Sequence, residues 1–134
     1  MKIGELARFS GSNVETIRYY EREGLLPKPR RSEGNYRIYS PMHLERLTFI
    51  RHCRGLDMTL NEIRTLLHFK ESPEENCGEV NRLLEERIGH VVRRIGELQE
   101  LEKQLLELRG RCPGERRAST CGILEGLSLS GIND

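Results

Sequence analysis

The sequence contains no tryptophan, and aromatic residues make up only 5% of its 134 residues. Charged residues make up 32%. So few aromatic side chains argue against a β-sandwich or barrel, and so many charges favour a helical, strongly solvated protein. A chain of this length can form one compact domain with an appendage, but not two full domains.

Long apolar runs are missing too. No segment approaches the length of a membrane span, and the opening MKIGELARFS lacks the apolar stretch of a signal peptide. We therefore expect a cytoplasmic protein with no membrane partner. Because cytoplasmic thiols stay reduced, we interpret the four cysteines as metal ligands or buried thiols rather than as disulfides.

Signatures of catalysis are absent as well. The sequence shows no nucleophile paired with a base, no glycine-rich phosphate loop and no paired carboxylates in a plausible cleft. We therefore do not expect an enzyme, and a small thiol-dependent metal-handling catalyst is the least favoured function.

The net charge of +1 conceals a difference between the two halves of the chain. Residues 1–72 carry 13 Lys and Arg against 9 Asp and Glu, and residues 73–134 carry 9 against 12, which recovers the totals of 22 and 21. A basic first half before an acidic second half favours a head that binds a polyanion and a separate body.

The first stretch, IGELARFSGSNVETIRYYEREGLL, predicts two short helices joined by a tight turn. Gly11 breaks the first helix, Ser12 followed by Glu15 is expected to form a capping box for the second, and Gly24 is placed to end it. This pattern is typical of a helix-turn-helix. On this stretch alone, an ordinary helical hairpin is an equal alternative.

The next stretch, PKPRRSEGNYRIYS, predicts a β-hairpin whose turn lies at residues 33–35 and whose second strand begins at Tyr36. Its basic residues are interleaved with tyrosines: Lys28, Arg30, Arg31 and Arg37 with Tyr36 and Tyr39. Beside a helix-turn-helix, such a hairpin is interpreted as a wing, with arginines for phosphates and tyrosines for the sugar-phosphate edge.

Two further helices are expected to support the head. Ser40-Pro41 starts the first of them and Gly55 ends it, while Thr59 with Glu62 forms a capping box for the second. Cys53, near the end of the first, is interpreted as a partly buried structural thiol.

A long helix is predicted over residues 77–110, closed by Gly110, with a short helix and a disordered tail beyond it. Its apolar residues step by 4, 3, 4 and 3, as in a coiled coil: Leu84, Ile88, Val91, Ile95 and Leu98. The chain offers too little neighbouring structure to cover this stripe. We therefore expect a homodimer.

Three cysteines flank the long helix. At about 1.5 Å per residue, Cys77 and Cys112 lie roughly 50 Å apart along it and cannot bind one ion within one chain. In an antiparallel dimer, Cys77 of the partner subunit would lie beside Cys112, and Cys121 would complete a three-sulfur site. Soft or borderline ions suit three thiolates, whereas a closed zinc site would need a fourth ligand, for which Glu115 is a weak candidate.

The alternatives concern the same residues. The four histidines are interpreted as ordinary polar residues: His43, His52, His68 and His90. Three unrelated buried thiols would be the plainest explanation of the cysteines, and a thiol redox switch on the same fold is the alternative function.

Several of these segments together resemble the MerR family of bacterial transcription regulators, over nearly the whole chain. IGELA, VETIRYYEREGLL, GNYRIY and LERLTFIRHCRGLDMTLNEIRTLL are similar to that family's winged helix-turn-helix head. The resemblance implies a homodimer on double-stranded promoter DNA that represses without inducer. With inducer it would bend and undertwist an over-long spacer, so that RNA polymerase meets both promoter hexamers aligned.

The resemblance also implies site residues and an inducer. The residues expected at DNA are Thr16, Arg18 and Tyr19 on the second helix, Tyr36 and Arg37 on the wing, and, as a weaker candidate, Arg54. The segments HCRGLDM, CGEVNRLLEERI and CGILEGL are similar to the branch that senses lead and cadmium, whereas copper sensors typically have serine at the position of Cys77. Pb(II) is therefore the expected inducer, and Cd(II), Hg(II) and Zn(II) stay open.

The expected fold is mainly α, in three parts. A winged helix-turn-helix DNA-binding domain covers residues 1–72, and a dimerising antiparallel coiled-coil helix covers residues 73–111. A metal-binding loop, a short helix and a flexible tail cover residues 112–134.

Overall fold

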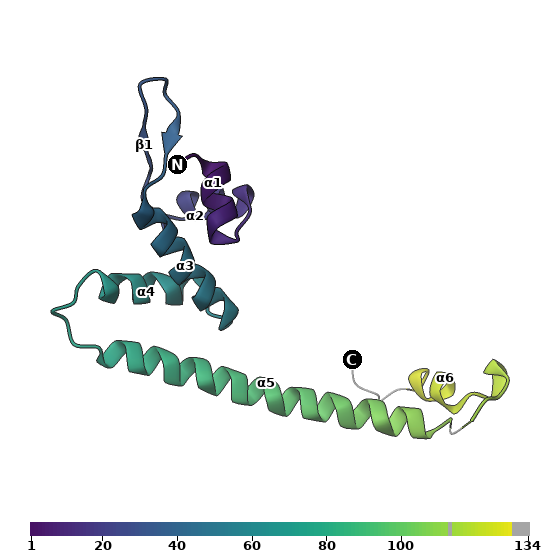
Figure 1. Ribbon diagram of the computed structural model, residues 1–134. Coiled ribbons are helices and arrows are strands. Elements are labelled where there is room, and N and C mark those ends of the chain that lie inside the picture. The colour runs from purple at the N-terminus through teal and green to yellow at the C-terminus, as the bar shows by residue number, and fades with distance from the viewer. Residues whose placement is uncertain (113, 130–134) are drawn as a thin grey trace. The chain divides into compact units, whose positions relative to one another are not determined.

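The computed structural model describes residues 1–112 and 114–129. The elements, in order, are α1 (Ile3–Ser10), α2 (Val14–Arg22), β1 (Arg30–Arg31), β2 (Arg37–Ile38), α3 (Pro41–Gly55), α4 (Leu60–Lys70), α5 (Gly78–Gly110), the 3-10 turn η1 (Ala118–Thr120) and α6 (Gly122–Leu127) (Figure 1). The expected mainly α fold, with its wing hairpin and long C-terminal helix, is confirmed. Within the described ranges, no helix combines the length and apolar character that crossing a bilayer requires.

The chain divides into two compact units, Met1–Leu83 and Leu84–Asp134. The predicted domain boundaries at residues 72 and 111 remain a prediction. Of the predicted disordered tail, only Ser128 and Leu129 belong to the described residues, and they follow the end of α6.

The turn between α1 and α2 corrects one expectation. The Ser12–Glu15 capping box is wrong, because Ser12 belongs to the turn and donates its backbone N–H to Ser10 Oγ at 3.3 Å. Asn13 is the N-cap, and its side-chain oxygen accepts the backbone N–H of Thr16 at 2.7 Å. An asparagine in extended backbone provides this bond as well as a serine does, so the helix starts one residue later than expected.

The core of the first unit is built from one apolar face of each helix. The buried side chains are Leu6, Ile17, Tyr20, Leu25, Leu26, Tyr39, Leu47, Ile50, Cys53, Met58, Ile63 and Leu67. Burying each large aliphatic side chain contributes about 1.5–3 kcal/mol, so this cluster fixes how α1 to α4 pack. Cys53 belongs to it, and burial raises the pKa of its thiol, as suits a structural cysteine.

The wing is held at its base rather than along its strands. β1 and β2 pair over only two residues each, Arg30 with Ile38 and Arg31 with Arg37. At the base, Tyr39 is 1% exposed, and its backbone exchanges two hydrogen bonds with Met1, at 2.7 and 2.8 Å. The base of the hairpin is therefore hydrogen-bonded to the first residue of the chain, beside α1 (Figure 1).

Helix α5 has no buried residue along its 33 positions. Its predicted stripe of apolar side chains lies in solvent, with Ile88 60% and Ile95 50% exposed. A stripe of this kind on a single helix needs a partner surface.

Gly11 and Gly24 both have left-handed backbone, but only one of them has a neighbouring side chain that an added Cβ would meet. Comparing them therefore distinguishes the energy of backbone strain from that of a steric overlap. Gly11 (φ +71°) and Gly24 (φ +75°) both lie in turns, but only at Gly11 would a Cβ overlap the Arg51 guanidinium, which donates to Ser10 O at 2.9 Å. We expect Gly24→Ala to lower the free energy of unfolding by about 1–2 kcal/mol. We expect Gly11→Ala to lower it by about 1 kcal/mol more. Urea unfolding of both variants checks the difference; equal losses would mean that the Arg51 contact contributes nothing.

Candidate nucleic-acid interface and cysteine pair

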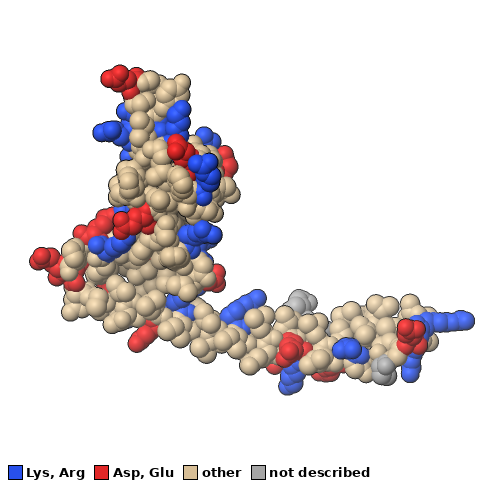
Figure 2. Space-filling model, in the orientation of Figure 1, with Lys and Arg blue, Asp and Glu red and all other residues tan. Residues whose placement is uncertain are grey.

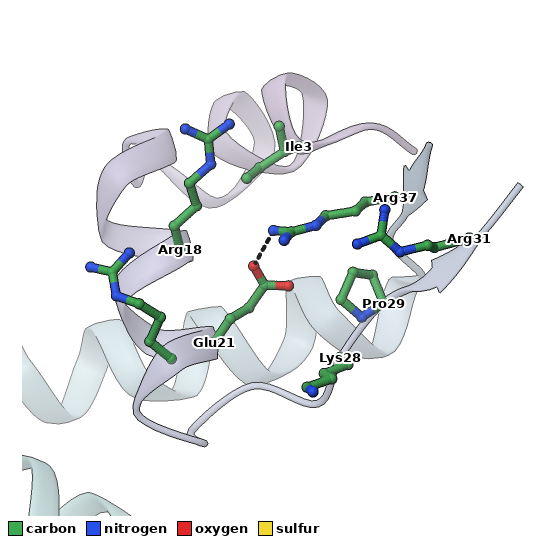
Figure 3. A pocket seen from close by; sticks show the side chains of 8 residues that line it. Ile3, Arg18, Glu21, Lys28, Pro29, Arg31 and Arg37 are labelled. Atoms are coloured by element: carbon green, nitrogen blue, oxygen red, sulfur yellow. Dashed lines mark hydrogen bonds and ion pairs between the residues drawn. The ribbon is translucent and has the colours of Figure 1, made fainter. Parts of the chain in front are cut away.

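A cationic cavity of about 580 Å³ lies between α2 and the wing. Its lining residues are Ile3, Arg18, Glu21, Arg22, Lys28, Pro29, Arg31 and Arg37 (Figure 3). Five of these eight side chains are cations. Figure 2 shows Lys and Arg side chains along the flanks of the hairpin. A concave surface with this charge attracts a polyanion such as a phosphate backbone.

Helix α2 places its predicted DNA-contacting residues on the side away from the core. Ile17 and Tyr20 are buried, which leaves Arg18 and Tyr19 exposed. Arg18 lines the cavity and pairs with Glu15 at 3.4 Å. Thr16 is half-buried at the start of the helix, and neither it nor Tyr19 lines the cavity.

Of the two wing residues predicted to contact DNA, only one lines the cavity. Arg37 lines the cavity, whereas Tyr36 is 64% exposed outside it, with Lys2 Nζ 5.2 Å from the centre of its ring. Arg54 donates to Met58 O at 2.9 Å at the end of α3 and is not among the lining residues. The structure thus brings Arg18 and Arg37 together and does not bring Arg54 to them.

Three cations of the cavity are absent from the predicted contact set: Arg22, Lys28 and Arg31. Arg22 had a usable signal, because it follows Arg18 by four residues and therefore shares its helix face. Lys28 and Arg31 belong to the basic stretch of the wing, but only the tertiary structure brings them to the same cavity as Arg18.

One carboxylate lies among these cations. Glu21 Oε2 accepts from Arg37 Nη1 at 3.2 Å (Figure 3). Glu21 Oε1 accepts from the Tyr39 hydroxyl at 3.2 Å. Burial, followed by the charge of Glu21, raises the pKa of Tyr39, so its hydroxyl stays protonated and donates.

The second unit carries a pair of cysteines. Cys121 is the N-cap of α6, and its carbonyl accepts the backbone N–H of Glu125 at 3.1 Å. The backbone N–H groups of Leu124 and Ile123 at the start of α6, with a smaller contribution from the Cys112 thiol, lower the pKa of the Cys121 thiol. The Cys121 thiol therefore loses its proton at a lower pH than an ordinary cysteine thiol does.

A hollow of about 480 Å³ opens beside this pair. Cys112 and Glu115 both line it, and Cys112 Sγ also donates to Gly114 O at 3.2 Å. The carboxylate predicted as a weak fourth ligand thus shares a surface with one of the two cysteines.

Cys77 belongs to the first unit and is exposed. Its carbonyl accepts the backbone N–H of Asn81 at 3.2 Å, which makes it the N-cap of α5. Within the described part of one chain, no three His, Cys, Asp or Glu residues come together as a metal site.

Three of the histidines are engaged elsewhere. His43 is buried and its Nε2 lies 3.0 Å from Pro27 O, His68 pairs with Glu75 at 3.1 Å, and His90 Nδ1 lies 2.6 Å from an Arg93 nitrogen. These contacts agree with their interpretation as ordinary polar residues.

The two cysteine environments predict opposite reactivity. Because the pKa of Cys121 is lowered and that of Cys53 is raised, Cys121 forms thiolate at lower pH. We expect iodoacetamide to modify Cys121 at a lower pH than Cys53, as measured by peptide mass spectrometry across a pH series. Cys112→Ala should move the Cys121 profile to higher pH, since it removes one donor. Overlapping profiles for Cys121 and Cys53 would contradict this assignment.

Comparison with known proteins identifies the family. The family model described as "MerR HTH family regulatory protein" matches residues 1–70, and "MerR, DNA binding" matches residues 44–108. A ZntR homolog described as an HTH-type transcriptional regulator of Haemophilus influenzae is 50% identical over 109 residues, covering 81% of each chain. The mercuric resistance operon regulatory protein of Bacillus cereus is 42% identical over 126 residues, covering 94% of this chain and 96% of that protein.

A solved structure agrees with these matches. The transcription regulator PbrR691 from Ralstonia metallidurans CH34, in complex with lead(II), has a TM-score of 0.87 and 51% sequence identity. The match covers 96% of this chain and 99% of that one. The relatives are regulators of transcription and not enzymes. The chain belongs to the MerR family of helix-turn-helix regulatory proteins and is a DNA-binding regulator of transcription.

Proposed function

We propose that the protein is a homodimeric, metal-responsive regulator that binds promoter DNA and activates transcription when Pb(II) binds a three-cysteine site shared between subunits. The observation that carries its DNA-binding half is the cationic cavity beside a helix-turn-helix. The observation that carries its metal-binding half is the cysteine set of the second unit: the Cys121 thiol has a lowered pKa to which Cys112 contributes, and Cys112 lines a hollow together with Glu115.

DNA would be held mainly through its phosphates. Arg18 on α2 and Arg37 on the wing face one cavity, so one backbone segment can contact both elements. Thr16 and Tyr19 would lie toward the bases and sugars, and Tyr36 at the exposed edge of the wing. Arg54 is a weaker candidate, because its guanidinium already caps the end of α3.

The partner of the exposed α5 stripe would be a second copy of the chain. Two identical stripes can bury each other in an isologous pair, as symmetric dimers do. An antiparallel pair places the start of one helix beside the end of the other. Cys77 of the partner subunit would then meet Cys112 and Cys121, and symmetry would supply two such sites.

The donor set fits a soft ion. Three sulfurs suit Pb(II), Hg(II) or Cd(II), whereas a closed Zn(II) site would need a fourth ligand, such as Glu115 or water. The 51% identical structure in complex with lead(II) supports Pb(II), whereas the relative named for mercuric resistance supports Hg(II). A thiolate site would also need a reducing compartment, and we therefore propose that the protein acts in the cytoplasm.

Metal binding would act on DNA by favouring one dimer shape over another. The two states must differ in metal affinity and in DNA distortion, since a ligand shifts an equilibrium only through differential binding. In the distorting state the spacer would be bent and undertwisted, which would align the promoter hexamers for RNA polymerase. Protein–DNA contacts would offset the deformation energy.

A competition titration tests the inducer. Lead, cadmium, mercury and zinc are added to the reduced, DNA-bound dimer against a common chelator, and sulfur-to-metal charge-transfer absorption is recorded. We expect lead to bind ahead of cadmium and zinc, because a three-sulfur site favours it. Near-equal binding of lead, cadmium and mercury would instead assign a broad soft-metal sensor.

The same preparation tests a second candidate function, a thiol redox switch, which the Cys112–Cys121 pair favours. A switch of that kind would change the DNA on addition of peroxide even with a chelator present. That response, together with no binding of any of the four metals, would overturn the metal-responsive function.

Mixed dimers test the shared site. Cys77→Ser and Cys112→Ser homodimers should bind no Pb(II) at high affinity, because each lacks a ligand in both sites. Mixing the two chains should restore one site per heterodimer, read as half the wild-type charge-transfer absorbance per purified heterodimer. The matched control mixes Cys112→Ser with Cys121→Ser chains, in which both sites stay broken. Recovery in the control, or none in the first mixture, would show that the ligands are not shared in this way.

A further inference from the structure

Glu21 is an acidic side chain in a cavity that otherwise presents cations. Its side chain is only 9% exposed, and it lies on α2 facing the wing (Figure 3). A carboxylate at a phosphate-binding surface repels the DNA and weakens binding by simple electrostatics. If the cavity binds DNA, another effect of Glu21 must therefore offset this repulsion.

The contacts of Glu21 supply one. Its two carboxylate oxygens bond to two different residues of the wing segment, Arg37 Nη1 and the Tyr39 hydroxyl, each at 3.2 Å. The wing itself has strands of only two residues, so its own ladder does little to fix the direction of its side chains. Glu21 is thus a direct link between the second helix of the helix-turn-helix and the wing.

We propose that Glu21 is a positioning residue for DNA binding, which orients the Arg37 guanidinium so that its remaining donors face a DNA phosphate. A guanidinium carries five N–H donors in a rigid fork, and Glu21 accepts from one nitrogen while the Arg37 side chain stays 45% exposed. The inference rests on the proposed DNA-binding function of this cavity. It predicts that Glu21 strengthens DNA binding, whereas its charge alone predicts that it weakens DNA binding.

Whether Glu21→Ala weakens or strengthens DNA binding decides between these two roles. The probe is a duplex that the wild-type protein enriches from a random-sequence pool, and affinity is measured by fluorescence anisotropy over a range of salt. We expect Glu21→Ala to bind about three- to tenfold more weakly, with a salt slope smaller by about one, as for a lost phosphate contact. Tighter binding by Glu21→Ala would overturn the proposal.

The matched control is Glu23→Ala. Glu23 lies two residues further along the chain and pairs with Arg64 at 2.9 Å, outside the cavity. Replacing it with alanine removes the same negative charge as Glu21→Ala does. Its loss should leave the affinity unchanged or slightly increase it. An equal weakening by Glu23→Ala would mean that the effect is not specific to the wing contact, and would overturn the proposal.

A double-mutant comparison shows whether Glu21 acts through Arg37. If it does, Glu21→Ala should add no loss of affinity to Arg37→Ala. Glu21→Gln keeps one acceptor oxygen for Arg37 and offers its NH2 group to the Tyr39 hydroxyl oxygen, so it should recover part of the binding. A further loss in the Arg37→Ala background would indicate a general effect on the fold and overturn the proposal. Glu21→Gln also decides the case if thermal unfolding shows Glu21→Ala to be unfolded. Failure of the wild-type protein to enrich any duplex would overturn the DNA-binding function itself.

Discussion

The exposed apolar stripe of helix α5 is the constraint on which most of the proposed function depends. Every large side chain along it lies partly in water, and the helix buries none of its residues within the described chain. Covering that stripe with a second copy removes an association hazard and creates symmetry in one step. In an antiparallel pair, the start of each α5 helix would then lie beside the end of the other, in two equivalent places. A dimer interface and a metal site would therefore follow from the same periodic pattern.

The cysteines illustrate how one residue type acquires different chemistry. Cys53 lies in the core, where low polarity disfavours its thiolate and raises its pKa. Cys121 lies at the start of α6, where backbone N–H groups and the Cys112 thiol stabilise the thiolate. Only the second environment is suitable for capturing a soft cation. The difference between the structural thiol and the proposed ligand thus rests on burial and on the local backbone rather than on the number of cysteines.

The DNA-binding head combines two elements that are weak alone. A nine-residue helix and a pair of two-residue strands form a cationic cavity because both are anchored to one core, through Ile17 on one side and Tyr39 on the other. The link from Glu21 to Arg37 adds a direct connection between them. Electrostatic attraction for phosphate is therefore supplied by side chains whose directions are set by packing and hydrogen bonding.

The sequence by itself determined what local periodicity and capping control. The ends of α3 and α5, the Thr59–Glu62 capping box and the stripe on α5 were predictable, because each depends on residues within a few positions of one another. The start of α2 was missed by one residue, because Asn13 competes with Ser12 as a cap on nearly equal terms. Only the tertiary structure brought Lys28 and Arg31 to the same cavity as Arg18, and Glu21 to Arg37 across sixteen residues of sequence. Such contacts depend on how the core anchors α2 and the base of the wing, and long-range anchoring leaves no periodic signal in the sequence.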